Sequence, residues 1–227
     1  MHIDDLKINK GEFVSFVGVS GGGKSCFMDI VNKFFSASSG TIRVFGKNIN
    51  EVDTDSLRKM YSVVLQDAFI FNDAVENNIS FPQAPDSLKI SQAIEKAQMK
   101  DFIGELPEHE KTVISDFGAN LSGGECQRIS VARALYRDAP VMLLDEPTSA
   151  LDAKTAGKMF EMLQNECKVG GKTVVVITHD IKRAAMADKV LVINGGKITE
   201  QGGPHELLKK DGAFKSLFEA QDNIKAK

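Results

Sequence analysis

The sequence has no long apolar run. No stretch of its 227 residues approaches the roughly 18–20 consecutive apolar residues that a membrane-spanning helix needs. The start is polar as well, with His2, Asp4 and Asp5 close behind the first methionine. A secretory signal needs a basic start followed by an apolar stretch, so neither a signal peptide nor a membrane span is expected here.

The chain also lacks an excess of basic residues and a framework of cysteines. It has 28 Lys and Arg residues and 31 Asp and Glu residues, a net charge of −3. This balance gives no support for a nucleic-acid partner. The three cysteines, Cys26, Cys126 and Cys167, are too few and too scattered for disulfides or a zinc site. We expect reduced, structural thiols, because disulfides are rare in the cytosol.

What is present is an ordinary globular balance, 42% hydrophobic and 26% charged, with alternating strand and helix patterns. Strands are predicted at residues 3–8, 13–17, 141–144, 173–177, 190–193 and 197–201, the last two joined by a turn at Asn194-Gly195-Gly196. Helices are predicted over residues 24–35, 87–99, 125–136, 154–167 and 205–220. The organisation is an α/β core, residues 1–66 and 138–227, interrupted by a mostly helical insert, residues 67–137.

A glycine-rich loop follows the strand at residues 13–17. The segment Gly18-Val19-Ser20-Gly21-Gly22-Gly23-Lys24-Ser25 satisfies the pattern G-x-x-x-x-G-K-[ST] in full. Its glycines let backbone N–H groups wrap phosphates at the positive end of the next helix. Lys24 supplies a charge to the β- and γ-phosphates, and the Ser25 hydroxyl can ligate Mg²⁺. A chance glycine turn is the alternative, but the flanking strand and helix favour a nucleoside triphosphate site.

Two carboxylates end the apolar strand at residues 141–144. They are Asp145 and Glu146. In proteins with such a phosphate loop, an aspartate at this place holds Mg²⁺. The neighbouring glutamate could polarise an attacking water. An ordinary strand ending in a charged turn is the alternative, and the phosphate loop upstream favours the functional interpretation.

The segment Leu121-Ser122-Gly123-Gly124-Glu125-Cys126-Gln127-Arg128 opens the helix predicted over residues 125–136. Ser122 and Glu125 form an S-x-x-E capping box. Each glycine of the first turn costs about 1 kcal/mol relative to alanine, and a plain capped helix does not explain the pair. Glycines there let a ligand approach the exposed N–H groups, where the helix dipole favours an anion.

This segment closely resembles the signature motif of the ABC ATPases, whose commonest form has Gln in place of Glu125, and the likeness covers essentially the whole chain. It implies a P-loop NTPase (RecA-like) core with an inserted α-helical subdomain. It also implies that the signature residues Ser122, Gly123, Gly124 and Glu125 serve ATP held by a second subunit, with Ser122 and Gly124 contacting the γ-phosphate. The active unit would be a head-to-tail dimer, with a homodimer expected, around two ATP and Mg²⁺.

The other family motifs follow in order along the chain. Gln66 resembles the Q-loop glutamine, which senses Mg²⁺ and the attacking water. Asp145 and Glu146 are similar to the Mg²⁺-associated aspartate and the catalytic glutamate. Asp152 belongs to a D-loop match that would cross the dimer interface, and His179 resembles the switch histidine that touches the γ-phosphate. The resemblance thus implies catalytic Glu146, His179, Gln66 and Lys24, Mg²⁺ ligands Ser25, Gln66 and Asp145, and nucleotide contacts from Gly18, Ser20, Gly21, Gly22, Gly23, Lys24, Ser25 and Cys26.

The segment before the signature, residues 112–120, resembles the exporter-type X-loop, with Ser115 and Asp116 replacing Gly and Glu. The resemblance implies the ATP-hydrolysing motor of an exporter, on the cytoplasmic side of a membrane, with a transmembrane domain as partner. An importer or solitary ABC ATPase stays open. So do a chromosome or translation machine, which would carry a coiled-coil insertion or two motor domains, and a non-hydrolysing regulatory domain.

Two features depart from the family pattern. Cys26 stands where the family usually has a threonine that helps hold the α-phosphate, and a thiol is a weaker hydrogen-bond partner. No aromatic residue precedes Phe13, whereas the family stacks adenine on one upstream of the phosphate loop. We therefore expect weak nucleotide affinity and a chain cut from a longer polypeptide.

Overall fold

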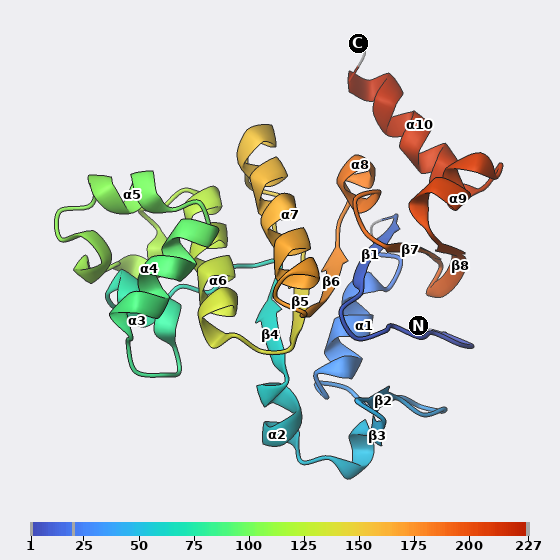
Figure 1. Cartoon of the computed structure of the whole chain (residues 1–227), viewed down its shortest axis with the longest axis horizontal. Helices are drawn as coiled ribbons and strands as arrows, with labels where there is room; N and C mark the ends of the chain where they lie inside the picture. The colour runs from blue at the N-terminus through green and yellow to red at the C-terminus, as the bar shows by residue number, and fades with distance from the viewer. Residues whose placement is uncertain (1, 20, 226–227) are drawn as a thin grey trace.

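A six-stranded sheet forms the centre of the computed structural model, which describes residues 2–19 and 21–225 (Figure 1). Its strands are β1 (Phe13–Gly18), β4 (Tyr61–Val64), β5 (Val141–Asp145), β6 (Thr173–Ile177), β7 (Lys189–Asn194) and β8 (Lys197–Gly202). They lie in the order β4-β5-β6-β1-β7-β8. The first five are parallel, and β8 pairs antiparallel with β7. A separate antiparallel pair joins β2 (Arg43–Val44) to β3 (Lys47–Asn48).

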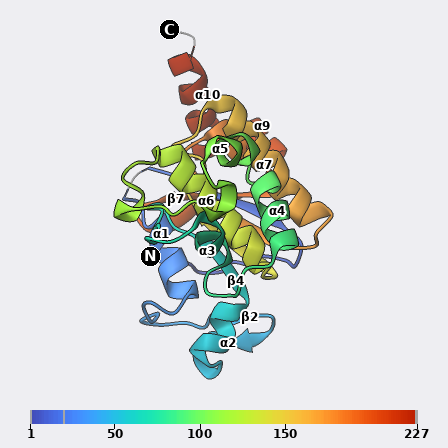
Figure 2. The ribbon, with the colours of Figure 1, turned by 90° about the vertical axis from the view of Figure 1, so that its left-hand side faces the viewer.

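Helices cover both faces of the sheet. They are α1 (Lys24–Val31), α2 (Thr54–Lys59), α3 (Val75–Ser80), α4 (Ser87–Lys96), α5 (Lys100–Glu105), α6 (Gly123–Arg137), α7 (Ala153–Lys168), α8 (Ile181–Ala184), α9 (Pro204–Lys209) and α10 (Ala213–Lys225). Single 3₁₀ turns occur at η1 (Ile49–Glu51), η2 (His109–Lys111) and η3 (Asp116–Gly118). Helices α3 to α6 gather beyond β4, in front of the sheet in Figure 2, and α9 and α10 lie at the opposite end, near β8.

Side chains along the buried strands alternate between two cores, as the pleat of a strand requires. Met142 and Leu144 pack with side chains of α6 and α7 on one face. Val141 and Leu143 pack with side chains of α1 and α2 on the other. The first core also contains Ile79 of α3, so the helical stretch between β4 and β5 shares its apolar core with the sheet.

The α/β core interrupted by helices confirms the fold class predicted from the sequence, and most elements agree within a few residues. The strand predicted at residues 3–8 is wrong, since this segment has no ladder partner among the described residues. It is held by a hydrogen bond from the His2 N–H to the Gly196 carbonyl and one from Lys189 Nζ to the Lys7 carbonyl. The helix predicted to residue 35 ends at Val31, and the tail helix is split into α9 and α10 by residues 210–212.

Candidate functional site

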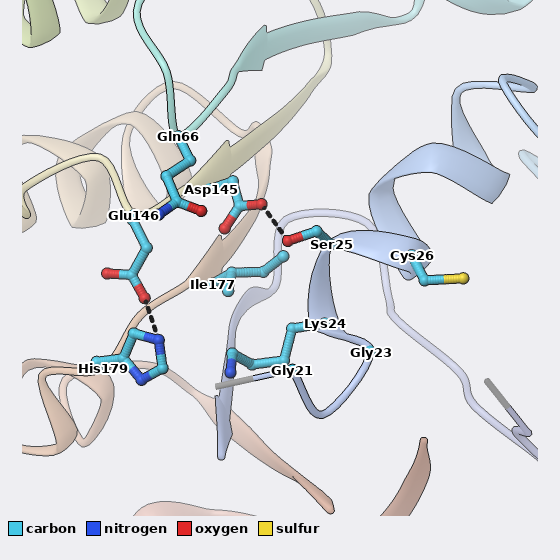
Figure 3. A pocket seen from close by; sticks show the side chains of 10 residues that line it. All are labelled: Gly21, Gly23, Lys24, Ser25, Cys26, Gln66, Asp145, Glu146, Ile177 and His179. Carbon is cyan, nitrogen blue, oxygen red and sulfur yellow. Dashed lines mark hydrogen bonds and ion pairs between the residues drawn. The ribbon is translucent and has the colours of Figure 1, made fainter. Parts of the chain in front are cut away.

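A cleft of about 320 Å³ lies at the carboxyl ends of the parallel strands β1, β4, β5 and β6. Open α/β sheets bind their ligands at this edge, because the loops that leave the strands converge there. Ten residues line the cleft (Figure 3): Gly21, Gly23, Lys24, Ser25, Cys26, Gln66, Asp145, Glu146, Ile177 and His179. Seven of the side chains predicted for the site are thus brought together from segments far apart in the sequence.

The loop between β1 and α1 forms the floor of the cleft. Gly18 leaves no room for a side chain, since a Cβ there would lie 2.0 Å from the Ile193 carbonyl oxygen of β7. Gly22 is buried within the loop and Gly21 and Gly23 line the cleft, while Ser20 lies outside the described residues. In the part of the chain that the structure describes, no side chain caps the N-terminus of α1, which leaves the N–H groups of its first turn available to bind an anion.

Lys24 and Ser25 occupy the first turn of α1. The buried Lys24 ammonium donates to the carbonyls of Gly18 at 3.0 Å and Val19 at 2.9 Å, which leaves its third N–H for another acceptor. Burial lowers the pKa of Lys24, while the nearby Glu146 and Asp145 carboxyl groups oppose that shift. The Ser25 hydroxyl donates to Asp145 Oδ2 at 2.7 Å, so a hydroxyl and a carboxylate already lie side by side.

Asp145 ends β5, and Glu146 begins the turn that follows. Glu146 has a φ of 49°, a left-handed conformation that costs a non-glycine residue roughly 1–3 kcal/mol. The turn is held by neighbours: the Glu146 N–H donates to the Ile177 carbonyl at 2.9 Å. Burial raises the pKa of Glu146 to about 7, with a further rise from the Asp145 charge. Burial also raises the pKa of Asp145.

His179 follows β6 and reaches the same cleft. Its Nε2 lies 3.4 Å from Glu146 Oε1, at the edge of contact between the two groups. Burial and the Lys24 charge lower the pKa of His179. Because the pKa of Glu146 is raised, this pair favours its neutral forms near pH 7 more than two free side chains would. Among the described residues, Glu146 Oε1 has no hydrogen-bond partner, so this atom can accept a proton from a ligand or a water.

Gln66 enters the cleft from the end of β4, and its side-chain amide lies beside Asp145 (Figure 3). Ser25, Gln66 and Asp145 therefore present oxygen atoms of the kind that Mg²⁺ prefers. Among the described residues, no group of three His, Cys, Asp or Glu side chains could hold a metal alone. Mg²⁺ usually takes one or two carboxylates together with phosphates of a substrate, and Asp145 supplies a carboxylate in this cleft. The Cys26 thiol points away from these oxygen atoms.

The signature residues lie outside the cleft. Ser122 caps α6: its Oγ accepts from the Glu125 N–H at 3.2 Å, and Glu125 Oε2 accepts from the Ser122 N–H at 2.7 Å. The capping box predicted from the sequence is confirmed. A Cβ at Gly124 would lie 2.9 Å from the Ala150 carbonyl oxygen. Close packing within the chain is therefore one physical reason for this glycine, which the sequence interpretation had assigned only to a ligand.

Asp152 also has a role within the chain, because its Oδ1 caps α7 by accepting from the N–H groups of Lys154 and Thr155. Sequence reasoning missed Gln127, which is 3% exposed and hydrogen-bonds to the turn between β5 and α7. The signal that could have revealed it is a polar residue on the apolar side of the helix predicted over residues 125–136.

A phosphate loop between a buried strand and a helix, with an aspartate at the end of a parallel strand beside it, defines a P-loop NTPase. The comparisons with known proteins narrow this class. The family described as ABC transporter matches residues 1–149, and the chain belongs to that family.

Curated relatives include the ATP-dependent lipid A-core flippases of Syntrophus aciditrophicus (strain SB) and Burkholderia orbicola (strain AU 1054). The first is 40% identical over 96% of this chain and 36% of the relative, the second 36% identical over 95% and 36%. A solved structure of a bacterial Atm1-family ABC exporter with ATP bound superposes with a TM-score of 0.88 at 33% identity, over 93% of this chain and 37% of that one. The chain thus spans little more than a third of these relatives. No helix of the described residues combines the length and apolar character that crossing a bilayer demands.

Proposed function

We propose that this chain is the ATP-binding and ATP-hydrolysing motor domain of an ABC exporter. The observation that carries the proposal is the cleft itself, in which Glu146 lies beside Asp145 and 3.4 Å from His179, together with Lys24 and Ser25. The likeness to lipid A-core flippases and to an Atm1-family exporter supports an export role.

The charge and position of each residue in the cleft indicate its role. Lys24 and His179 bind the γ-phosphate, and the loop N–H groups bind the remaining phosphates. Ser25, Gln66 and Asp145 would hold Mg²⁺, which would supply positive charge to the phosphates. Glu146 orients the attacking water and accepts its proton at Oε1. Phosphoryl transfer depends mainly on positioning and electrostatic stabilisation, and these contacts supply both.

The proposed assembly is a head-to-tail homodimer around two ATP, in which Ser122 and Gly124 reach the nucleotide of the partner. The position of the signature outside its own cleft supports this arrangement. Residues 1–66 and 138–227 form the RecA-like core, and residues 67–137 the helical subdomain. A transmembrane domain at the cytoplasmic face of the membrane is the second partner.

Glu146→Gln tests the proposal directly. The change keeps the size of the side chain and removes its ability to accept the proton of water. We expect ATP binding to persist and steady-state hydrolysis with Mg²⁺ to fall by about 10²- to 10⁴-fold, the usual contribution of a general base. Nucleotide titration and phosphate release measure the two effects.

The matched control is Glu161→Gln, an equal change at an exposed position of α7, which should leave hydrolysis unaltered. Hydrolysis by Glu146→Gln at the wild-type rate would contradict the catalytic role of Glu146. A wild-type chain that binds ATP without releasing phosphate would instead favour a regulatory nucleotide-binding domain.

A further inference from the structure

Gln127 is a buried glutamine with nearly all of its hydrogen-bonding capacity directed at one turn. Its Nε2 donates to the Glu146 carbonyl at 2.6 Å and to Ser149 Oγ at 3.1 Å, and its Oε1 accepts from the Ala150 N–H at 3.0 Å. An amide side chain can make about four hydrogen bonds, so three are used on this turn. A buried polar side chain with that many partners fixes their relative positions.

The turn that Gln127 holds contains the strained residue of the site. With a φ of 49°, Glu146 keeps its conformation only if the surroundings determine it. Its carbonyl accepts from Gln127 Nε2 on one side and from Ser149 Oγ, at 3.2 Å, on the other. The orientation of the Glu146 peptide sets the direction of its Cα–Cβ bond, and hence where its carboxyl group lies in the cleft.

The helix that carries Gln127 is the one whose first turn is the signature. Ser122 caps α6, and Gln127 follows five positions later, within the same rigid helix. Packing between Gly124 and the Ala150 carbonyl holds the helix and the turn together at a second point. The Gln127 hydrogen bonds and this packing are thus two direct contacts between the signature helix and the turn that holds Glu146, and neither passes through the sheet.

We propose that Gln127 is a positioning residue for Glu146, which ties the signature helix to the carboxyl group that acts on water. The inference rests on the proposed ATPase function and goes beyond it. In the proposed dimer, the signature contacts the ATP of the partner, and Gln127 links that segment to the carboxyl group that acts on the chain's own ATP.

Two variants remove these hydrogen bonds, the first all of them and the second a part. Gln127→Leu fills a similar volume and removes all three hydrogen bonds. Gln127→Glu keeps the acceptor for the Ala150 N–H and, when ionised, cannot donate to the Glu146 carbonyl. We expect both variants to bind ATP within about twofold of wild type and to lose about 10- to 100-fold in single-turnover hydrolysis, the scale of a misplaced catalytic group. The loss should appear in kcat, with KM little changed.

The matched control is Tyr136→Phe on the same helix. It removes the hydroxyl that donates to the Ala84 carbonyl at 2.6 Å and accepts from the Asp86 N–H at 3.0 Å, away from the turn. Its unfolding midpoint should fall while its hydrolysis rate stays at that of wild type. If Gln127→Leu fails to fold, Gln127→Glu alone decides.

If the wild-type chain is active and the Gln127 variants hydrolyse ATP within twofold of its rate, the inference is overturned and the proposed function is not. A rise of KM by about 10- to 100-fold with an unchanged kcat overturns the inference as well. An inactive wild-type chain overturns the proposed function together with the inference.

Discussion

Glu166 is a buried carboxylate held between two lysines. Lys172 Nζ lies 2.7 Å from its Oε2, and Lys96 pairs with its other oxygen. Burial alone would raise the pKa of Glu166, but the hydrogen bonds and charges of Lys172 and Lys96 together outweigh it and lower the pKa. Lys172 also pairs with Asp138 at 2.8 Å. The group therefore joins α4, α7 and the start of β6.

Because its pKa is lower in the folded chain, Glu166 stabilises the fold above its unfolded pKa and loses this effect as pH falls through the folded pKa. Glu166→Gln should lower the free energy of unfolding at pH 7 by about 1.5–3 kcal/mol, the contribution of a hydrogen bond to a charged group. The difference from wild type should shrink below about pH 4. Urea unfolding at several pH values measures it.

Glu95→Gln is the control for that series. Glu95 pairs with Lys100 at 2.8 Å, but both side chains are 63% exposed. Exposed pairs contribute roughly 0–1 kcal/mol, so little change is expected at any pH. A constant difference between Glu166→Gln and wild type from pH 7 to pH 3 would contradict the assignment.

Residue types alone reached only part of the site. Lys24, Ser25 and Asp145 followed from a spacing that phosphate and Mg²⁺ chemistry require, and the structure places them in one cleft. Gln66 and His179 carry no local pattern, so only the family resemblance indicated them. The role of Gln127 was not predicted, because its hydrogen-bond partners lie in a turn whose position against α6 cannot be read from the sequence.

At the scale of elements, the first turn of α6 packs closely against the turn before α7. A Cβ at Gly124 would meet the Ala150 carbonyl oxygen at 2.9 Å, while one at Gly123 would meet the Ala150 Cβ at an ordinary 3.4 Å. Gly124→Ala should therefore lower the free energy of unfolding by about 1–3 kcal/mol, the usual cost of overpacking. Urea unfolding at pH 7 measures it.

Gly123→Ala is the matched change one residue earlier. Alanine is favoured over glycine in a helix by up to about 1 kcal/mol, so this variant should equal or exceed wild type in stability. Equal effects at the two positions would count against packing as the reason for Gly124.

Elements with strong local patterns were predicted well, and those that depend on partners were not. The capping box of Ser122 and Glu125 located the start of α6, and the Gly195-Gly196 turn located the β7–β8 hairpin. Residues 3–8 alternate like a strand yet form no ladder among the described residues, and pairing beside the edge strand β8 is limited to an isolated bridge between His2 and Lys197. Sequence also gave no order for the parallel strands.

At the scale of the whole molecule, the proposed dimer is the main expectation. Ser122→Arg should leave ATP binding by one chain nearly intact and abolish ATP-driven dimerisation, because in the proposed dimer the signature contacts the nucleotide of the partner. Light scattering with ATP and Mg²⁺ on the Glu146→Gln background measures it. Ser91→Arg, at an exposed position of α4, is the control. A dimer peak equal to that of the control would refute the trans arrangement.

The order of strands also governs when the site can form during synthesis. β1 is buried along its whole length and lies between β6 and β7, both of which are made after residue 172. A growing chain that has reached Glu146 holds every phosphate-loop residue and both carboxylates, yet β1 has neither of its neighbours. Long-range pairings of this kind form late and slowly. β7 begins at Lys189 of 227 residues, so the ribosome must deliver more than four fifths of this chain before the apolar strand β1 has both neighbours. During this period a folding chain is prone to aggregate.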